Sequence, residues 1–547
     1  MARTDQQPTP DRRLTEAAAR LGLGRRRFLT VASAAAALAF TTELPSAHAT
    51  DNELAPRALT ENPFTLGVAS GDALGDAVVL WTRLAPRPLE PGSGLPPAGL
   101  VEVDWEVARD ERFRKVARRG TARAHAEFDW SVHVDVDGLD HDRVYWYRFR
   151  VGAWTSPVGR TRTAPARNRH VDRVRFGLVS CQAYEDGYFT AYKHLAEEDL
   201  DAVFHVGDYI YEYGIDAAGG DRKYTDRTLP SLFAHETTTL ADYRLRYSLY
   251  KTDPDLQAAH AAFPWYVTWD DHEVENNYAA GIPEKGQSPE AFVARRAAAT
   301  RAYWENMPLR MPRPNATELK LYRRHHYGRL AQFDILDTRQ YRSDQANGDG
   351  WQYPTAESAD PRRTLMGATQ ERWLLDGLRS SRAVWNVVPQ QVVLSRRKNT
   401  TAEVSKLSMD AWDGYPAARE RLLAGVEDIG VENLVVLTGD VHVAYAMDVK
   451  RDFDNPDSRT VGVEIVGTSI ASDGDGEEHP GNWATLTAAN PHLKFYDGRR
   501  GYTAITLDEE HARADYRVVS HITRPGGTVS TAASFVSEAY NPGLQRA

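Results

Sequence analysis

The sequence contains a single cysteine, Cys181, among its 547 residues. A disulfide within the chain is therefore excluded, and the lone thiol is either a small buried apolar side chain or a group with a chemical role. Dense runs of lysine and arginine are also missing after the first fifty residues, and the formal net charge is -10. This balance argues against nucleic acid as a dedicated partner, although local basic patches can still bind small anions.

Long apolar runs are absent outside the N-terminal region, so no membrane-spanning helix is predicted for the rest of the chain. The N-terminal region has the three parts of an export signal. Arg25 and Arg26 precede an alanine-rich apolar run, Val31–Phe40, and small residues at Ala47–Ala49 suit a cleavage site. Residues 1–49 resemble a twin-arginine leader, and the alternative is a basic tail with an incidental helix. We expect a secreted, extracellular protein exported by the twin-arginine translocation machinery.

The length exceeds that of one average domain, and two domains are the natural expectation. Residues 62–165 contain short alternating strands separated by Gly, Pro and Asp turns, which is typical of a small all-β, fibronectin-like sandwich. From residue 171 to residue 547 the pattern changes to strands alternating with helices. Its first unit, strand–helix–strand at 174–206, predicts a parallel strand pair within an α/β domain.

Helices are predicted at several places in the second domain. The C-terminal one, Ser530–Tyr540, has apolar residues at helical spacing, Ala533, Val536 and Tyr540. It either lies over a site as a lid or packs as a terminal helix, and packing is the commoner arrangement. The other predicted helices are Tyr188–Glu198, Leu240–Tyr250, Pro289–Met307 and Thr369–Arg379.

Residues able to bind metal ions stand at four predicted strand ends. The apolar strand Ala202–Val206 is followed by Gly207 and Asp208, with Tyr211 three residues further on. Because ligands gather beyond the carboxyl ends of strands in open α/β sheets, we expect the four ends to converge on one site. Each residue taken alone could instead be a helix cap or part of the core. The other three strand ends carry Cys181, Asp271 with His272, and Asp440 with His442.

The mixture of donor groups predicts two unlike cations. Thiolate, phenolate and imidazole favour a transition metal such as iron, whereas carboxylates favour Ca²⁺, Mn²⁺ or Mg²⁺. Two cations that share a carboxylate suit phosphoryl transfer.

These stretches resemble the motifs of the PhoD-like alkaline phosphatases and phosphodiesterases, within the calcineurin-like metallophosphoesterase superfamily. At three motif positions the superfamily usually has Asp, Asn and His, whereas this chain has cysteine, aspartate and aspartate in that order. The same replacements characterise the PhoD-like group. The likeness runs from about Phe64 to the end and includes the leader. The matching motifs are Cys181, Gly207–Tyr211, Asp270–Glu273 and Gly439–His442, with further matches at Ser70–Asp72, Val79–Arg83, Asp242–Arg244, Trp269–Asn277 and Asp337–Arg342.

The resemblance implies an α/β metallophosphoesterase domain, a βαβ sandwich with the metal site at its strand ends, preceded by the all-β domain. It implies Fe³⁺ and Ca²⁺ as cofactors, with Mn²⁺, Mg²⁺ or Zn²⁺ as alternatives for the second ion. Asp208 would bind both ions. Cys181, Tyr211 and His442 would complete the Fe³⁺ site, and Asp271 and Asp440 would complete the Ca²⁺ site.

The resemblance also implies roles for residues around the ions. His272 would hydrogen-bond to a phosphoryl oxygen or protonate the leaving group. Arg339 and Arg342 either bind a phosphate or pair with Asp337 and Asp344. His205 is interpreted as structural or as support for a ligand, and Gln390 or Gln391 is a weak candidate for a position that holds histidine in the family.

The expected function is hydrolysis of phosphate monoesters or diesters by attack of a metal-bound hydroxide at phosphorus, by a protein that acts as a monomer. One alternative is a phospholipase D-like hydrolysis of phospholipid headgroups. An alternative of another class is a non-catalytic metal- or phosphate-binding surface protein, with the sandwich as its adhesive part. The complete ligand set and His272 favour an enzyme.

Overall fold

The structure is a computed structural model, and the predicted export signal with Arg25 and Arg26 lies outside its described residues. In the part of the chain that is described, no helix is both long and apolar enough to cross a membrane. The described residues are 59–217, 220–222, 228–284, 286–314 and 319–547.

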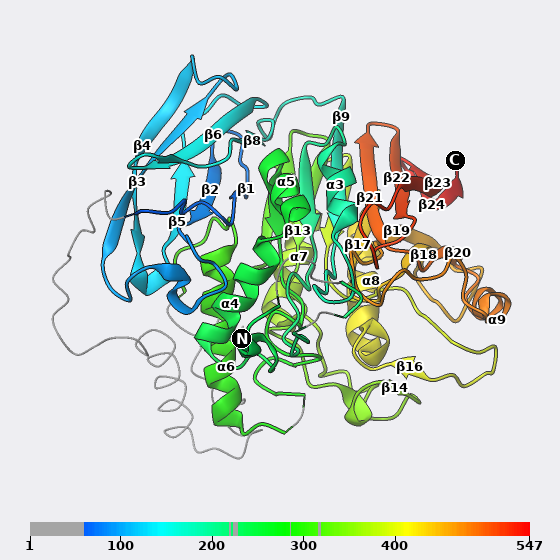
Figure 1. Ribbon diagram of the computed structural model, residues 1–547. Coiled ribbons are helices and arrows are strands. Elements are labelled where there is room, and N and C mark those ends of the chain that lie inside the picture. The colour runs from blue at the N-terminus through cyan, green and yellow to red at the C-terminus, as the bar shows by residue number, and fades with distance from the viewer. Residues whose placement is uncertain (1–58, 218–219, 223–227, 285, 315–318) are drawn as a thin grey trace, which may run out of the picture.

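Two mixed β-sheets form the centre of the molecule (Figure 1). The larger sheet has ten strands in the order β24-β23-β22-β21-β9-β10-β11-β1-β2-β5, and the smaller has seven in the order β12-β13-β15-β17-β19-β18-β20. The two sheets pack face to face. The ring of Phe333 lies 5.3 Å from that of Phe176 and 4.7 Å from that of Phe204, which belong to the opposite sheet.

Parallel strands at the middle of both sheets are buried along most or all of their length, as expected of strands covered on both faces. In the ten-stranded sheet they are β9 (Arg173–Val179), β10 (Ala202–His205) and β11 (Pro264–Val267). In the seven-stranded sheet they are β13 (Ala331–Ile335), β15 (Trp385–Pro389), β17 (Leu434–Thr438) and β19 (Thr460–Val466). The antiparallel strands are β12 (Arg323–Tyr327), β18 (Ala444–Lys450), β20 (Leu493–Asp497), β21 (Gly501–Asp508), β22 (His511–Val519), β23 (Val529–Glu538) and β24 (Asn541–Arg546).

Helices cover the outer faces of the two sheets, so the α/β half is layered helix, sheet, sheet, helix. Local signals set the helix ends. The Thr239 side chain and Asp242 form a capping box at the start of α4, and Ser288 caps α6. Helices α3 (Thr190–Ala196), α4 (Leu240–Lys251), α5 (Pro254–Ala262) and α6 (Pro289–Asn306) lie on the ten-stranded sheet, and α7 (Gly367–Ser380) and α8 (Pro416–Ile429) lie on the seven-stranded sheet. The short helix α9 (Trp483–Ala489) precedes β20.

The predicted strand–helix–strand unit is confirmed, because β9 and β10 are parallel neighbours joined through α3. The predicted C-terminal helix at Ser530–Tyr540 is wrong. This stretch is strand β23, which pairs with β22 and β24 and buries alternate residues, Ala533, Phe535 and Ser537. The period-two pattern prevails over the helical spacing because both edges of the strand have partners, and a helical lid over the site is excluded with it.

The predicted all-β half is present, but it is not separate from the rest. Strands β1 (Val68–Gly71), β2 (Val78–Arg83) and β5 (Ser131–Val136) continue the ten-stranded sheet, because β1 pairs in parallel with β11. A five-stranded sheet packs over them to complete the sandwich. That sheet contains β3 (Leu100–Ala108), β4 (Val116–His125), β6 (Val144–Val151), β7 (Trp154–Thr155) and β8 (Gly159–Arg162).

Asp72, just after β1, ties the two halves together. Its side chain is fully buried, and its backbone is left-handed with a φ of 43°. Oδ2 accepts a hydrogen bond from the backbone N–H of Arg310 (2.8 Å), and Oδ1 accepts from Nε (2.8 Å) and Nη2 (2.7 Å) of Arg323. Burial alone would raise the pKa of Asp72, but Arg323 and His325 hold it well below its usual range.

We predict that Asp72→Asn lowers the free energy of unfolding by about 3 kcal/mol, because it leaves the Arg323 guanidinium without its carboxylate. The folded-state pKa is depressed, so the wild-type advantage is present above the unfolded pKa of about 4 and is lost as the pH falls further. Urea unfolding at pH 7 and in acid measures both effects. Asp76→Asn, at an exposed position nearby, is the control. Equal stability of Asp72→Asn and wild type at pH 7 would contradict the prediction.

Candidate metal centre

A glycine turn brings two strand ends together. Gly207, after β10, has a φ of 120°, and a Cβ built on it would lie 2.4 Å from Cβ of Asp270, after β11. Only glycine permits this approach. The backbone N–H of Cys181, after β9, donates to Gly207 O (3.1 Å). Cys181, Asp208 and Asp270 therefore follow three adjacent parallel strands at one edge of the sheet.

Four of the predicted ligands have left-handed backbone. The φ values are 57° for Cys181, 59° for Asp208, 68° for Asp440 and 55° for His442. For residues other than glycine this conformation is uncommon, and each instance costs on the order of 1–3 kcal/mol. Strained backbone of this kind gathers at functional sites, and here it gathers where the sequence predicts one.

The six predicted ligands converge. The hydroxyl of Tyr211 donates to Oδ2 of Asp208 (3.3 Å) and lies 2.9 Å from Nε2 of His442. The possible metal donors form three groups, and the donor atoms inside each group lie within 4.8 Å of one another. Asp208 and Asp271 each belong to two of these groups. The groups are Cys181, Asp208 and His442; Asp208, Asp271 and His272; and Asp270, Asp271 and Asp440.

Neighbouring side chains orient these donors. Nδ1 of His442 lies 2.6 Å from Oδ2 of Asp473, which directs Nε2 towards Tyr211. Buried Glu273 accepts hydrogen bonds from the backbone N–H groups of Asp208 (3.1 Å) and Asp270 (2.9 Å), and so links the two turns. Burial raises the pKa of Glu273 to about 8.

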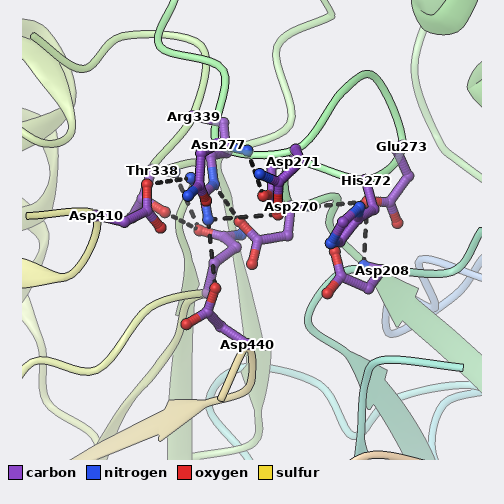
Figure 2. Close-up of polar contacts among 12 residues, drawn as sticks. Asp208, Asp270, Asp271, His272, Glu273, Asn277, Thr338, Arg339, Asp410 and Asp440 are labelled. Carbon is purple, nitrogen blue, oxygen red and sulfur yellow. Dashed lines mark hydrogen bonds and ion pairs between the residues drawn. The ribbon is translucent and has the colours of Figure 1, made fainter. Parts of the chain in front are cut away.

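Arg339 lies in the middle of the acidic groups (Figure 2). Its side chain is inaccessible to solvent. Nε donates to Asp270, Nη1 lies 2.7 Å from Oδ1 of Asp410, and Nη2 lies 3.4 Å from carboxylate oxygens of both Asp271 and Asp440. One guanidinium thus contacts four carboxylates.

Arg342 is also buried and does not line an open surface. Nη1 donates to Oδ1 of Asp410 (2.5 Å), and Nε donates to the carbonyl oxygen of Thr338 (2.7 Å). Of the two alternatives for Arg339 and Arg342, pairing with Asp337 and Asp344 is not what the structure has, because the two guanidinium groups bind Asp270 and Asp410 instead. Phosphate binding by these arginines stays a prediction. The Asp337 carboxylate accepts hydrogen bonds from the backbone N–H groups of Arg339 (3.1 Å) and Gln340 (3.0 Å).

Burial and mutual repulsion make the ionised acids unfavourable here. Burial, with nearby acidic side chains, raises the pKa of Asp208 and of Asp440 well above the usual range. Burial also raises the pKa of Asp270, to about 7, and raises the pKa of the Cys181 thiol and of the Tyr211 phenol.

His272 is held by a residue that the sequence analysis did not assign to the site. Its Nδ1 lies 2.7 Å from Oε2 of Glu212, and Oε1 of Glu212 accepts the backbone N–H of Asn276 (2.7 Å). The imidazole stacks on the Tyr211 ring with 4.2 Å between ring centres. Burial alone lowers the pKa of His272, but Glu212, Asp271 and Asp208 together raise it well above its usual value.

The donor set fits the two predicted cations. Oδ1 of Asp208, Oδ2 of Asp270 and Oδ1 of Asp271 are buried and have no hydrogen-bond partner among the described residues. A buried carboxylate oxygen without a partner is costly, and an ion would satisfy it. Thiol, phenol and imidazole lie on one side of Asp208, and oxygen donors alone lie on the side of Asp270 and Asp440.

The glutamine candidates are not ligands. The amide of Gln391 accepts from the Thr338 hydroxyl (2.7 Å) and donates to the Thr268 hydroxyl (3.0 Å), and Gln390 donates to the Thr438 hydroxyl (2.6 Å). Both amides are therefore engaged in the protein interior. His205 accepts the backbone N–H of Gly207 (3.3 Å) within the core, which agrees with a structural role.

Four site residues were not predicted as such: Glu212, Asp270, Asp410 and Asp473. Asp270 stands inside a recognised motif, and its place beside Asp271 at a strand end was an available signal. Glu212 directly follows Tyr211, but nothing in its spacing indicates a histidine partner. Asp410 and Asp473 lie on loops that reach the centre only through the tertiary fold.

Comparison with known proteins gives consistent matches. The family model "PhoD-like phosphatase" matches residues 176–516, and "PhoD-like phosphatase, N-terminal domain" matches residues 48–165. Alkaline phosphatase D of Bacillus subtilis (strain 168) is 50% identical over 526 residues, which cover 95% of this chain and 89% of that protein. A solved structure described as "Structure of PhoD" superposes with a TM-score of 0.85 at 51% identity, covering 89% of this chain and 92% of the other.

Proposed function

The chain belongs to the PhoD-like phosphatase family, and on this basis we propose that it is a metal-dependent phosphoesterase acting on phosphate monoesters and diesters. Its general class, an alkaline phosphatase of the PhoD-like type, follows from the family. The observation that carries the metal dependence is the pair of buried carboxylate oxygens, Oδ1 of Asp208 and Oδ2 of Asp270, that have neither a hydrogen bond nor an ion pair among the described residues.

We assign Fe³⁺ to the thiol, phenol and imidazole side of Asp208 and Ca²⁺ to the oxygen-only side, with Mn²⁺, Mg²⁺ or Zn²⁺ as alternatives for the second ion. Bound there, the two cations supply neutralisation of the phosphoryl oxygens and activation of the attacking water. Asp208 is shared. Cys181, Tyr211 and His442 complete one set, and Asp270, Asp271 and Asp440 complete the other.

His272 is the proposed proton donor to the leaving alcohol. Nδ1 of the His272 ring is hydrogen-bonded to Glu212. Nε2 is therefore the ring nitrogen that faces a substrate bound beside the carboxylates of Asp208 and Asp271. Stacking on Tyr211 fixes the plane of the ring. Glu212 does not touch the reacting atoms and acts by positioning.

Phospholipid headgroups remain an alternative substrate within the same chemistry, because they are phosphodiesters. No feature of the described residues favours phospholipid headgroups over soluble phosphate esters. A phospholipid is therefore one of the substrates in the test below. Export by the twin-arginine machinery, and action outside the cell, also belong to the proposal. They rest on residues 1–49 of the sequence.

We predict that the metal-loaded enzyme hydrolyses p-nitrophenyl phosphate and bis(p-nitrophenyl) phosphate. His272→Ala should lower kcat by on the order of 10²–10⁴-fold on both, because the leaving group loses its proton donor. Glu212→Gln should lower kcat by on the order of 10–100-fold, as expected when the partner that orients a site histidine is lost. Metal content should stay at the wild-type level in both variants. Phosphatidylcholine is assayed in parallel at equal metal loading.

The control is Glu236→Gln, which removes an acid from a half-exposed site in the segment between β10 and α4. Failure of the metal-loaded wild type to cleave either p-nitrophenyl ester would overturn the proposed function. Full activity of a metal-loaded His272→Ala enzyme would remove the proton donor from the mechanism but leave the function standing.

We predict that the two metal sites can be separated. EGTA should abolish hydrolysis while a visible absorption band from Tyr211 bound to Fe³⁺ persists, and added Ca²⁺ should restore turnover. Tyr211→Phe should remove the band because its phenol oxygen is lost. Tyr213→Phe, which changes an exposed neighbour, should keep it. Cys181→Ser should lower the iron content of the purified protein. Loss of colour and activity together on EGTA treatment would refute the assignment of two unlike ions.

We predict that Arg25→Lys with Arg26→Lys blocks export, so that the precursor stays in the producing cells. Immunoblots of cells and culture medium measure the distribution, and N-terminal sequencing of the exported form should begin at Thr50. The control is Arg12→Lys with Arg13→Lys, an arginine pair not followed directly by the apolar run. Undiminished secretion of the Arg25 and Arg26 double variant would reject this route.

A further inference from the structure

Three segments that are far apart in the sequence meet beside Asp440. Arg397 lies on the loop after β15, Trp351 lies in the short strand β14 (Trp351–Gln352), and Tyr445 lies in β18. Cζ of Arg397 is 5.2 Å from the centre of the Trp351 ring and 5.8 Å from that of the Tyr445 ring. Nη1 of Arg397 donates to the Tyr445 hydroxyl (3.5 Å). The guanidinium is thus held between two aromatic faces.

Strand β14 belongs to a small peripheral element. It pairs with β16 (Leu407–Ser408), and the two strands lie away from both large sheets (Figure 1). Trp351 is 37% exposed and Tyr353 is 55% exposed, so this element presents aromatic surface to solvent. Arg397 is half-buried beneath Trp351.

The Arg397 guanidinium is not held in an ion pair within the described part of the chain. Its two neighbours in sequence both pair with Asp454, Arg396 through Nη1 and Lys398 through Nζ at 3.6 Å. Oδ1 of Asp413 binds Nη1 of Arg419 (2.6 Å), and Oδ2 accepts only the backbone N–H of Arg397 (2.9 Å). Within the described part of the chain, the Arg397 guanidinium forms no ion pair with a carboxylate.

The loop that carries Arg397 is anchored on both sides. Nε2 of His492 donates to the carbonyl oxygen of Arg396 (2.7 Å). The backbone of Lys398 exchanges hydrogen bonds of 2.8 and 2.7 Å with the Asn490 side chain. Because this backbone is already ordered, a ligand of Arg397 would lose little of its binding energy to ordering the loop.

The position relative to the metal centre indicates which part of a substrate could reach Arg397. Burial lowers the pKa of Arg397, but Tyr445 and Asp440 are close enough to outweigh it and raise the pKa. Asp440 belongs to the oxygen-only side of the centre, and Tyr445, which accepts a hydrogen bond from Arg397, follows it by five residues in the sequence. Arg397 therefore lies near the oxygen-only side of the centre, where a substituent of a phosphoryl group bound by that side would extend.

We propose that Arg397, Trp351 and Tyr445 form a subsite for the second ester substituent of a phosphodiester, and that the subsite selects substituents carrying an oxyanion. This inference rests on the proposed function and adds a substrate class to it. A guanidinium presents a planar fork of donors that matches a carboxylate or phosphate oxygen pair. The exposed face of Trp351 can cover the apolar part of the same substituent.

The test uses two diesters that share the leaving group and the reacting phosphoryl group, p-nitrophenyl ethyl phosphate and p-nitrophenyl 2-carboxyethyl phosphate. The measured quantity is the ratio of kcat/KM for the carboxylated ester to kcat/KM for the ethyl ester. Arg397→Ala should lower this ratio on the order of tenfold, the loss of one charge-assisted contact. Arg397→Lys should lower it less, because the charge remains while the fork is lost.

Lys398→Ala is the matched control, since it removes an equal charge one residue away and should leave the ratio as in wild type. Arg397→Gln gives a second measurement if the alanine variant does not fold, as judged by circular dichroism and metal content. A ratio that is the same in wild type and in the Arg397 variants would overturn the subsite while leaving the phosphoesterase function intact. Absence of wild-type turnover on both diesters and on p-nitrophenyl phosphate would overturn the function and the subsite together.

Discussion

Buried negative charge is the constraint on which the centre depends. Asp208, Asp270, Asp271 and Asp440 bring donor oxygens within 4.8 Å of one another in overlapping groups. At such separations two like charges repel by about 4 kcal/mol, even at the effective dielectric of a protein site. Arg339 offsets part of this repulsion by contacting three of these carboxylates, but three carboxylate oxygens still have no hydrogen-bond partner among the described residues. Under the proposed function, cations complete a centre arranged in this way.

The sheet architecture explains how such a centre is held in place. β11, which leads into Asp270 and Asp271, has β10 on one side and β1 on the other. The N-terminal all-β half therefore supports the strand that delivers two of the acids. Buried Asp72 at the end of β1 strengthens this junction by binding Arg323 of β12, at the edge of the opposite sheet.

Much of the site was predictable from the sequence because parallel strands end at a common edge. Asp208, Asp271 and Asp440 each follow an apolar run, and the fold brings them together as expected. Spacing could not reveal Asp473, since it reaches His442 from a loop whose path depends on the whole fold. The C-terminal helix failed for a related reason, because strand β23 owes its conformation to hydrogen bonds with β22 and β24 rather than to its own residue pattern.

The turn after β10 joins the proposed metal donors to the proposed proton donor. Tyr211 directs its phenol to His442 and Asp208, and the next residue, Glu212, directs its carboxylate to His272. One short stretch of backbone therefore sets both geometries.

Helix α4, which lies in the long insertion after this turn, holds that backbone in place. Nη1 of buried Arg246 donates to the carbonyl oxygens of Tyr211 and Tyr213, and the Tyr250 hydroxyl accepts the backbone N–H of Tyr211 (3.0 Å). The insertion contributes no metal donor of its own to the described site. Its role is to fix the turn, so that the ring of Tyr211 can stack on His272 while its oxygen faces the metal side. The same constraint that orders the donors thereby orders His272, the proposed acid, beside them.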